Sequence, residues 1–397
     1  MAAVNLVFSK YNEKFFSYGY TNENSGPVNV LDYLLNSQPI VAEEDEKEVP
    51  LVEVELEGRL VIKEKSNGGE ELQLVGGGGF VQLELGNVNG FSYFSGMKVR
   101  VRCVQTSPGA HSAQILSVCP FPSLPLAQLN GDFDFLRVFM GFGPLLNGDS
   151  YEHFDYFLSK AACSSASALI LSGPFYNPAE PNKAVEQTRI TFAKIVEKFK
   201  GQKTKVLILP NANNDVLSTN TFPTPAQKPR LLGLDALPEN IQFLPDPAIF
   251  TLNGISFVAT TTDPLKHLAK LERYCGELAS GSDRMSILCE HLLQQQSACP
   301  VTFGPESDVM VNIQGNHFSQ RPHFFIVPSN LAPLKRNVQN TVFVNPGRFL
   351  FGQKVRYTKL DVNIKRGRTN HADSVGFSDF SSVDNRNEPI VEQKPTQ

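Results

Sequence analysis

The sequence predicts an α/β domain whose sheet layers are covered by helices, together with a smaller all-β barrel. The first observation is a set of short apolar runs bounded by turn residues, such as Ala168–Leu171 and Lys205–Leu209. Such runs are typical of strands buried on both faces of an α/β sheet. Helical stretches such as Ala184–Lys200 lie between them, which gives repeated β-turn-α units. The second observation is apolar–polar alternation, interrupted by glycines, over residues 49–125, which is typical of short antiparallel strands.

Composition sets the broad class. The chain has 397 residues, 41% of them hydrophobic, which is enough for two domains with cores. Its net charge of -4 excludes a global basic field that would attract nucleic acid. The six cysteines include no C-x-x-C pair, so a structural zinc site is not expected. With no signal peptide and no long apolar segment, we expect reduced thiols, an intracellular location and no membrane contact.

The first 125 residues are expected to form two regions. Residues 1–48 are interpreted as an aromatic N-terminal arm and an acidic linker, with a short amphipathic helix at Val28–Leu35. Residues 49–125 are predicted to form an OB-fold domain, because several short strands at this spacing favour a small closed barrel. The glycines at 76–79 are interpreted as a hairpin turn, since no Lys-Ser/Thr and no helix follow them. The clearest alternating segments are Val52–Leu56, Leu72–Val75, Val81–Leu85 and Val99–Cys103.

Residues 130–365 are predicted to form the α/β domain, after a stiff proline-containing linker. The polar residues 366–397 lack apolar periodicity and are predicted to be a disordered tail. The loop at 211–240 is long and rich in proline. Strands are expected at 136–141, 168–171, 205–209, 255–260, 324–327 and 341–344, and helices at 151–163, 188–199 and 285–295.

In open α/β sheets, chemistry is found in the loops at the carboxyl ends of the strands. Here the first such strand ends in Gly141–Pro144, the second in Gly173–Asn177, and the third continues into Asn211–Asn214. Near the C-terminus, Ile326–Leu331 is followed by the turn Asn345–Gly347. In order and contents these strand ends resemble those of the calcineurin-like metallophosphoesterases, which implies a phosphoesterase-like sheet sandwich with helices outside. In that family, carboxylates and histidines at these places hold two metal ions.

Nearly all of the ligands that this resemblance implies are replaced. Pro174 stands where a bridging Asp is expected, Asn177 where an outer Asp is expected, and Asn213 at the position of the catalytic His. Neutral amides supply no charge against a divalent cation. We therefore predict no catalytic residue, no metal and no cofactor, and hence a protein that is not an enzyme. The degenerate positions are Gly143, Pro144, Pro174, Asn177, Asn213, Ser329 and Leu331.

Other residues that carry chemistry are interpreted as structural. Gly315–His317 spells Gly-Asn-His but lies far beyond the third strand, and Asp132 and Asp134 precede the first strand. Asp263 is expected to cap a helix beginning near Pro264. Ser282 or Asp283 is expected to cap the helix that follows. The histidines interpreted as packing or hydrogen-bonded residues are His267, His291, His317 and His323.

Longer motifs narrow the family. They are Thr261–Leu268, Ser282–Gln295, Phe325–Leu331 and Val342–Phe349. Their order and spacing, behind a predicted OB barrel, resemble the B subunits of replicative DNA polymerases, specifically those of polymerase alpha–primase. The resemblance covers about residues 15–365.

The resemblance implies a nuclear, non-catalytic accessory subunit. A protein of this kind binds the C-terminal domain of the polymerase catalytic subunit and, through it, the primase subunits. It supports primer synthesis and the initiation of DNA replication, and it contacts DNA only weakly or indirectly. Which residues form the partner interface does not follow from the sequence.

Two other functions stay open. One is an active metal-dependent phosphodiesterase with an unorthodox site, in which Asp215 or His317 would take part. The other is a module that binds single-stranded DNA through aromatic side chains of the barrel. The outward positions of the predicted barrel strands are mostly Glu and Gln, which disfavours strand binding.

Overall fold

The computed structural model divides the chain into two compact units. Unit 1 is formed from residues 1–17, 126–263 and 322–397, and unit 2 from residues 18–125 and 264–321. The residues that the structure describes are 6–8, 53–66, 68–76, 79–86, 88–105, 112–119, 121, 123–128, 135–211, 215–216, 220–228, 230, 233, 237–276, 283–302, 309–312, 316–351, 354–363 and 375–381.

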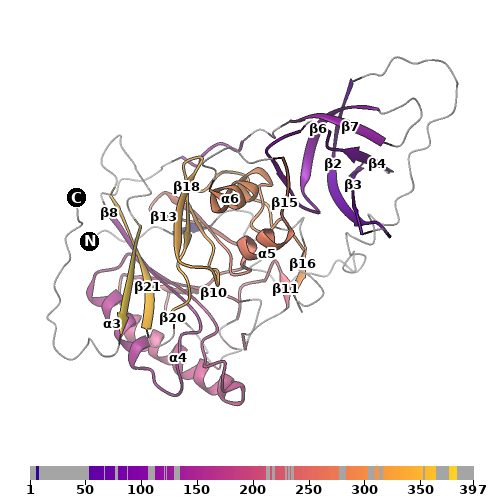
Figure 1. Ribbon diagram of the computed structural model, residues 1–397. Coiled ribbons are helices and arrows are strands. Elements are labelled where there is room, and N and C mark those ends of the chain that lie inside the picture. Colours follow the sequence, from indigo (N-terminus) through magenta and orange to yellow (C-terminus); the bar gives the residue numbers. More distant parts are fainter. Residues whose placement is uncertain are drawn as a thin grey trace, which may run out of the picture. The chain divides into compact units, whose positions relative to one another are not determined.

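Unit 1 contains two mixed sheets (Figure 1). One has six strands in the order β1-β13-β14-β17-β19-β18, in which β14, β17 and β19 run parallel. The other has the order β12-β10-β9-β8-β21-β20, with β22 also paired to β21, and β8, β9, β10 and β12 are parallel. The strand bounds are β1 Leu6–Phe8, β8 Phe135–Phe142, β9 Ala168–Ser172, β10 Lys205–Leu209, β12 Ile241–Phe243, β13 Ala248–Leu252, β14 Ile255–Ala259, β17 Phe324–Ile326, β18 Leu334–Val338, β19 Thr341–Asn345, β20 Leu350–Phe351, β21 Lys354–Asn363 and β22 Val375–Ser381.

The two sheets of unit 1 face each other across an apolar core. Alternate residues of β8, among them Val138 and Met140, contribute to the same buried cluster as residues of β13, β14, β17 and β19. Phe250, Phe257 and Phe324 occupy neighbouring strands and stack in register, with ring centroids 5.3 Å apart. Aromatic cross-strand pairs of this kind fix register as well as burying surface. This packing forms the sheet sandwich.

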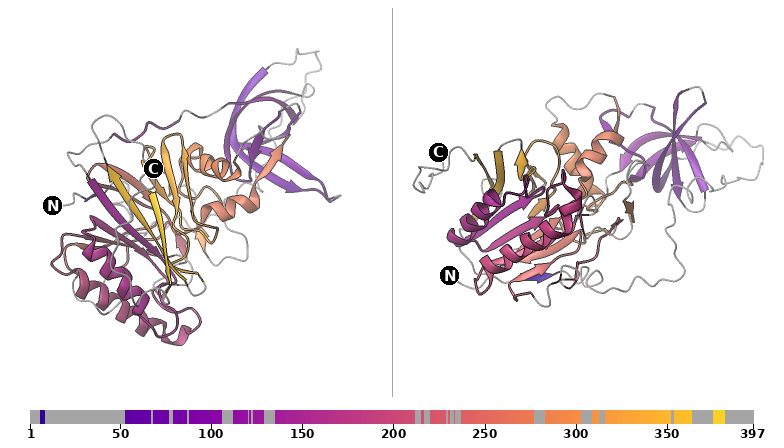
Figure 2. Two further views of the ribbon diagram at one scale, coloured as in Figure 1. Left: turned by 60° about the vertical axis from the view of Figure 1, so that its left-hand side comes forward. Right: turned by 90° about the horizontal axis from the view of Figure 1, so that it is seen from below.

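Helices cover the outer face of the second sheet. α3 (Glu152–Cys163) and α4 (Ala184–Phe199) lie side by side against it in Figures 1 and 2. Phe154 and Phe157 of α3, with Phe192 of α4, belong to a second buried cluster with the sheet residues that point away from the sandwich. The layers are therefore sheet, sheet and helices. The remaining short elements of unit 1 are η1 (Pro181–Lys183) and β11 (Thr221–Phe222).

Unit 2 contains a closed five-stranded barrel in the order β2-β3-β4-β7-β6. Adjacent strands of the barrel are antiparallel, except β4 and β7, which run parallel to each other. Gly76 and Gly79 pair across the β3–β4 connection, as expected for a hairpin turn. Leu60, Val101 and Ile115 are among the side chains that fill the barrel. The strands are β2 Glu53–Glu64, β3 Glu70–Gly76, β4 Gly79–Glu84, β6 Lys98–Gln105 and β7 Ser112–Cys119.

A second segment of the chain completes unit 2. β5 (Phe91–Tyr93) pairs antiparallel with β15 (Arg273–Cys275), which follows α5 (Pro264–Leu271). α6 (Arg284–Gln294) follows, and the Asp283 carboxylate caps it by accepting hydrogen bonds from Met285 N and Ser286 Oγ. The remaining strand is β16 (Met310–Val311).

The structure bears out most of the expected elements and changes two boundaries. Every strand and helix expected between residues 136 and 344 is present. Residues 264–321, predicted to belong to the α/β domain, are grouped with the barrel because their contacts are with it. The predicted disordered tail is wrong at 375–381, where β22 pairs with β21 over seven residues. The sequence signal for this strand was short: only Val375 and Phe377 alternate with the small residues Gly376 and Ser378. The helix expected at 28–35 lies outside the described residues.

Candidate functional site

The carboxyl ends of β8 and β9 meet backbone against backbone at one edge of unit 1. A Cβ added at Gly143 would lie 2.5 Å from the carbonyl carbon of Gly173 and from the nitrogen of Pro174. Gly143 N donates to Ser172 O at 3.0 Å, and Leu145 N donates to Pro174 O at 3.2 Å. The Gly143–Pro144 and Gly173–Pro174 peptide bonds are both cis. The structure thus brings three of the predicted positions, Gly143, Pro144 and Pro174, together in a seam that admits no side chain at Gly143.

The end of β10 joins the same seam. The Asn211 side chain donates from Nδ2 to Gly173 O at 3.0 Å. The carboxylate of Asp215 lies so close to Gly173 that a Cβ there would collide with it. Burial raises the pKa of Tyr176, and the charge of Asp215 raises it further. The predicted position Asn213 lies outside the described residues.

Asn177 makes hydrogen bonds that stabilise the loop between β9 and α4. Its side-chain oxygen accepts a hydrogen bond from Ala179 N at 3.2 Å, and its backbone N–H donates to Gln187 Oε1 at 2.8 Å. The Gln187 amide also donates to Asp149 at 3.1 Å, which ties this loop to the loop that follows β8. Asn177 is therefore used as a turn residue of the β9–α4 connection.

Ser329 and Leu331 are held by one buried amide, that of Asn345 at the end of β19. Its Oδ1 accepts from Ser329 N and Gly347 N, each at 2.9 Å. Its Nδ2 donates to Leu331 O at 3.1 Å and to Ala332 O at 3.0 Å. All four hydrogen-bonding positions of the amide are satisfied. The predicted closing turn at 345–347 thus organises the neighbouring loop.

A buried carboxyl group, Asp246, lies among the ends of β10, β12 and β14. It accepts from Thr261 N at 2.9 Å and from Thr261 Oγ1 at 2.6 Å, and the same hydroxyl lies 3.0 Å from Pro210 O. Burial raises its pKa to about 6, and hydrogen bonds from Thr261 partly oppose that rise. Asp246 is not among the positions predicted from the sequence. The available signal was a single acidic residue inside the apolar stretch 243–250.

These groups do not form a ligand set for a divalent ion. Within the described residues, no group of three or more His, Cys, Asp or Glu is placed to hold a metal. Apart from the carboxylate of Asp215, the groups described at the seam are backbone atoms, prolines and neutral amides, which supply no charge against a doubly charged cation. Asp263 Oδ2 accepts from Asn330 N at 3.2 Å, directly before α5 begins at Pro264.

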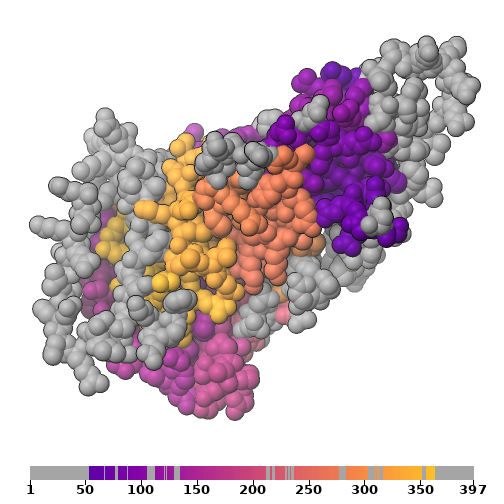
Figure 3. All heavy atoms as spheres, in the orientation of Figure 1, coloured from indigo at the N-terminus to yellow at the C-terminus, as the bar shows by residue number. Residues whose placement is uncertain are grey.

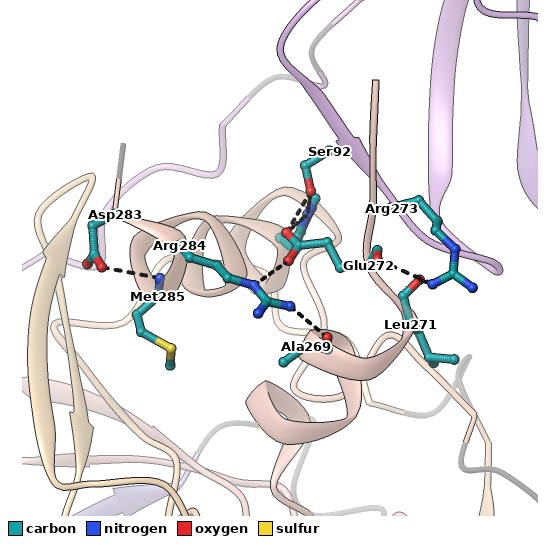
Figure 4. A network of polar contacts seen from close by, with 9 residues as sticks. Ser92, Ala269, Leu271, Glu272, Arg273, Asp283, Arg284 and Met285 are labelled. Carbon is teal, nitrogen blue, oxygen red and sulfur yellow. Dashed lines mark hydrogen bonds and ion pairs between the residues drawn. The ribbon is translucent and has the colours of Figure 1, made fainter. Parts of the chain in front are cut away.

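Unit 2 contains a second polar centre, built around Glu272 (Figure 4). Its side chain is fully buried and accepts from Ser92 Oγ at 2.7 Å and from Arg284 Nε at 3.2 Å. His291 Nε2 lies 2.8 Å from the Ser92 hydroxyl and 3.6 Å from Glu272. Burial alone would raise the pKa of Glu272, but hydrogen bonds, first among them that from His291, lower it to about 2. Arg284 also donates to Ala269 O at 2.7 Å.

The Ser-His-Glu set of unit 2 does not have the geometry of a catalytic triad. In a triad the hydroxyl and the carboxylate contact opposite nitrogens of the imidazole. Here both lie at Nε2 of His291, and Nδ1 has no hydrogen-bond partner among the described residues. Ser92 donates its proton to Glu272, so the hydroxyl is not activated by the imidazole. The set joins the barrel residue Ser92 to the second segment of unit 2.

Of the four histidines interpreted as packing or hydrogen-bonded groups, the structure shows such contacts for His291, His317 and His323. His291 is buried, and its ring meets Phe94 edge-on at 5.2 Å. His323 is buried and accepts at Nδ1 from Ser256 N at 3.1 Å. His317 is half-buried, with Nδ1 3.1 Å from Gln296 O, and burial lowers its pKa. His267 is half-buried on α5. Asp132, Asp134, Ser282 and Gly315 lie outside the described residues.

Comparison with known proteins first defines the class. A family model that describes the B subunits of DNA polymerases alpha and epsilon matches residues 140–336. Over these residues the chain matches the family of polymerase B subunits.

The similar proteins within that family are of the alpha type. The B subunit of DNA polymerase alpha from Caenorhabditis elegans is 26% identical over 308 residues, which cover 73% of this chain and 51% of the relative. The Rattus norvegicus protein of the same name is 25% identical over 70% of this chain and 48% of its own length, and that of Schizosaccharomyces pombe 24% over 73% and 56%. The chain spans about half the length of these curated relatives.

Solved structures give only a distant likeness. Vacuolar protein sorting 29 from Cryptosporidium parvum is 9% identical, covering 63% of this chain and 100% of its own, with a TM-score of 0.30. An archaeal phosphodiesterase is 9% identical over 62% of this chain and 99% of its own, with a TM-score of 0.32. At these scores neither likeness bears on function. Within the described part of the chain, every helix is too short or too polar to cross a membrane.

Replacing Gly143 by alanine should destabilise unit 1 strongly. The new methyl group would meet backbone atoms of residues 173–174 rather than a flexible side chain. We expect a loss of about 2–4 kcal/mol in the free energy of unfolding, as for an overpacked site that cannot relax. Gly148→Ala is the matched control, because Gly148 has φ 63° and nothing within 4 Å of a Cβ. It should lose only about 1 kcal/mol. Equal losses in a denaturant titration would show that the seam is not tightly closed.

Asp246→Asn should change how stability depends on pH. The folded-state pKa is raised above the unfolded value, so ionisation opposes folding. The stabilisation is complete below about pH 4 and is lost as pH rises through about 6. The difference in unfolding free energy, wild type minus Asp246→Asn, should fall by about 3 kcal/mol between pH 3 and 7. Glu239→Gln, at an exposed carboxylate, controls for the loss of one charge. A difference that stays constant with pH would contradict the burial of an ionisable Asp246.

Glu272→Gln should destabilise unit 2 at neutral pH, because Arg284 loses its buried partner. We expect a cost of about 1–3 kcal/mol, as for losing hydrogen bonds to a buried charged group, because the half-exposed Arg284 stays solvated. The folded-state pKa of Glu272 is lowered, so its contribution is present above about pH 4.5 and is lost as pH falls towards 2. Hydrogen exchange in β5 and β15 reports this unit directly. Glu70→Gln, which breaks the half-exposed 3.0 Å pair with Arg273, should cost under about 1 kcal/mol.

Proposed function

We propose that this chain is a non-catalytic accessory subunit of the DNA polymerase alpha–primase complex. It would bind the C-terminal domain of the polymerase catalytic subunit, reach the primase subunits through it, and support primer synthesis and the initiation of replication in the nucleus. The observation that carries the proposal is the family match over residues 140–336. The names of the relatives, all alpha-type B subunits, support the choice within the family.

The chemistry of the strand ends supports a role without catalysis. A two-metal phosphoesterase needs several carboxylates and histidines that converge on one point. In unit 1 the corresponding loops are joined by backbone packing at Gly143 and Gly173, and by the amide of Asn345. We propose that unit 1 is a phosphoesterase-like fold in which this edge serves as a rigid framework.

We also propose that the barrel of unit 2 is an OB-fold. Numbered along the chain, its strands follow the order 1-2-3-5-4 and close through the first and fourth, with a parallel contact between the third and fifth. This is the Greek-key arrangement of that fold. Binding of DNA by the barrel would be weak, because two of its cations are already paired. Glu57 lies 2.7 Å from Lys98 and 3.0 Å from Arg100, and both cations also face the ring of Phe121.

The test is capture of the polymerase. The tagged chain, treated with a chelator that is then removed, is mixed with the recombinant C-terminal domain of the polymerase alpha catalytic subunit from the same organism. We expect a stoichiometric complex in size-exclusion chromatography with light scattering, unchanged by the chelator treatment. An unrelated protein with the same tag is the control. Failure to form this complex would sink the proposal.

Two parallel assays examine the alternatives. Manganese-supplemented hydrolysis of a generic phosphodiester should stay at the background of the Asp215→Ala and His317→Ala variants. Hydrolysis that these variants abolish would instead indicate an enzyme. Binding of an oligo(dT) strand should be weak, whereas tight binding that falls steeply with salt would favour a strand-binding barrel.

A further inference from the structure

Two loops of unit 1 form one surface, which we call the closing-loop surface: residues 330–333 after β17 and residue Arg348 after β19. On the buried side, the amide of Asn345 donates to Leu331 O and Ala332 O. On the exposed side, Arg348 Nε donates to Asn330 Oδ1. Both sets of hydrogen bonds restrain the backbone of residues 330–332.

Gly347 brings the two loops into direct contact. Its φ of 72° lies in the left-handed region, and a Cβ there would be 2.9 Å from Pro333 Cγ. Glycine is the residue that adopts this conformation without strain and allows this approach. The position of the Arg348 backbone is thus determined by the packing of the turn on Pro333.

The closing-loop surface places an exposed cation near an exposed apolar side chain. Asn330 and Arg348 are exposed, and Leu331 is 37% exposed although it is apolar. Figure 3 shows part of the orange-yellow segment of unit 1, which contains β18, at the molecular surface. Among the described residues, no carboxylate forms an ion pair with Arg348. Arginine is enriched among the residues that contribute most to binding a partner.

Rigidity separates this surface from an ordinary exposed leucine. Isolated apolar residues on a surface are common and need no explanation. Here the backbone of Leu331 is held by a fully satisfied buried amide, so binding would order little that is not ordered already. Preorganisation of this kind lowers the entropic cost of association. The orientation of Arg348 is likewise restrained by its bond to Asn330, which leaves the rest of the guanidinium for a partner.

We propose that the closing-loop surface is a docking site for a protein segment that presents a carboxylate beside an apolar side chain. The carboxylate would pair with Arg348, and the apolar side chain would cover Leu331. The inference rests on the proposed function in one respect, since it takes the C-terminal domain of the polymerase catalytic subunit as the protein that carries this segment.

The test measures the affinity of that recombinant domain for the whole chain and for four variants. Leu331→Asp and Arg348→Glu alter the proposed site. Val185→Asp and Arg189→Glu are matched controls, because they change an exposed aliphatic residue and an exposed arginine on α4. All four must keep the thermal unfolding midpoint of the wild type within a few degrees. We expect Leu331→Asp and Arg348→Glu each to weaken binding at least tenfold, and the controls less than twofold.

The outcomes separate the inference from the function on which it rests. If wild type binds and all four variants bind alike, the docking site is wrong while the proposed function stands. If wild type does not bind, both fail. A charge swap gives a second line of evidence, because one Asp→Lys or Glu→Lys change in the partner domain should restore binding to Arg348→Glu and weaken binding to wild type. If no acidic position in that domain does so, the carboxylate partner is overturned. If a competing oligo(dT) strand displaces the domain, Arg348 binds phosphate groups instead, and the proposed protein-docking site is wrong.

Discussion

The contact between the backbone at Gly143 and the backbone at 173–174 determines the character of the strand-end edge of unit 1. Two parallel strands can bring their following loops this close only where no Cβ intervenes. Once the loops touch, the amide of Asn211 can reach Gly173 O, which adds the end of the third strand. In most α/β sheets this edge is left open to a ligand. Here the loops after β8, β9 and β10 pack against one another at this edge, and these contacts restrain their backbones.

Most of the hydrogen-bonding groups described at this edge are neutral amides and backbone groups. The amide of Asn345 makes four hydrogen bonds and carries no charge, so its burial is fully compensated. Asp215, beside Gly173, and the buried Asp246 carry carboxylates, and Asp246 shows what burial of such a group costs. Even with two bonds from Thr261, burial raises its pKa to about 6, because desolvation of the ionised form outweighs those bonds. A framework built mainly from amides keeps its geometry over a wider pH range than one built from carboxylates.

The sequence predicted what is local and missed what depends on distant contacts. Short apolar runs bounded by turns located β8, β9 and β10, and with them the loops at their carboxyl ends. The grouping of residues 264–321 with the barrel was not predictable, because Glu272 and His291 meet Ser92 across 180 and 199 residues of sequence. Nothing near Glu272 distinguishes it from an exposed residue at the end of an amphipathic helix. The role of Asn345 was partly visible as a closing turn, but its four partners required the fold.

Burial of Glu272 gives a physical reason for joining the barrel to the second segment of unit 2. A buried carboxylate is costly unless it is paired and hydrogen-bonded, so Glu272 favours the packing that brings Ser92, Arg284 and His291 to it. The Gln295 side chain reinforces this selection, since it accepts from Lys98 N at 2.8 Å and donates to Lys98 O at 2.9 Å. The family match at 140–336 runs through this segment without a break. The segment interrupts the sequence of unit 1 between β14 and β17, yet its polar groups serve the barrel. The two units are therefore interleaved along the chain, and a fragment that ends at residue 125 would leave Ser92 and the backbone of Lys98 without their partners.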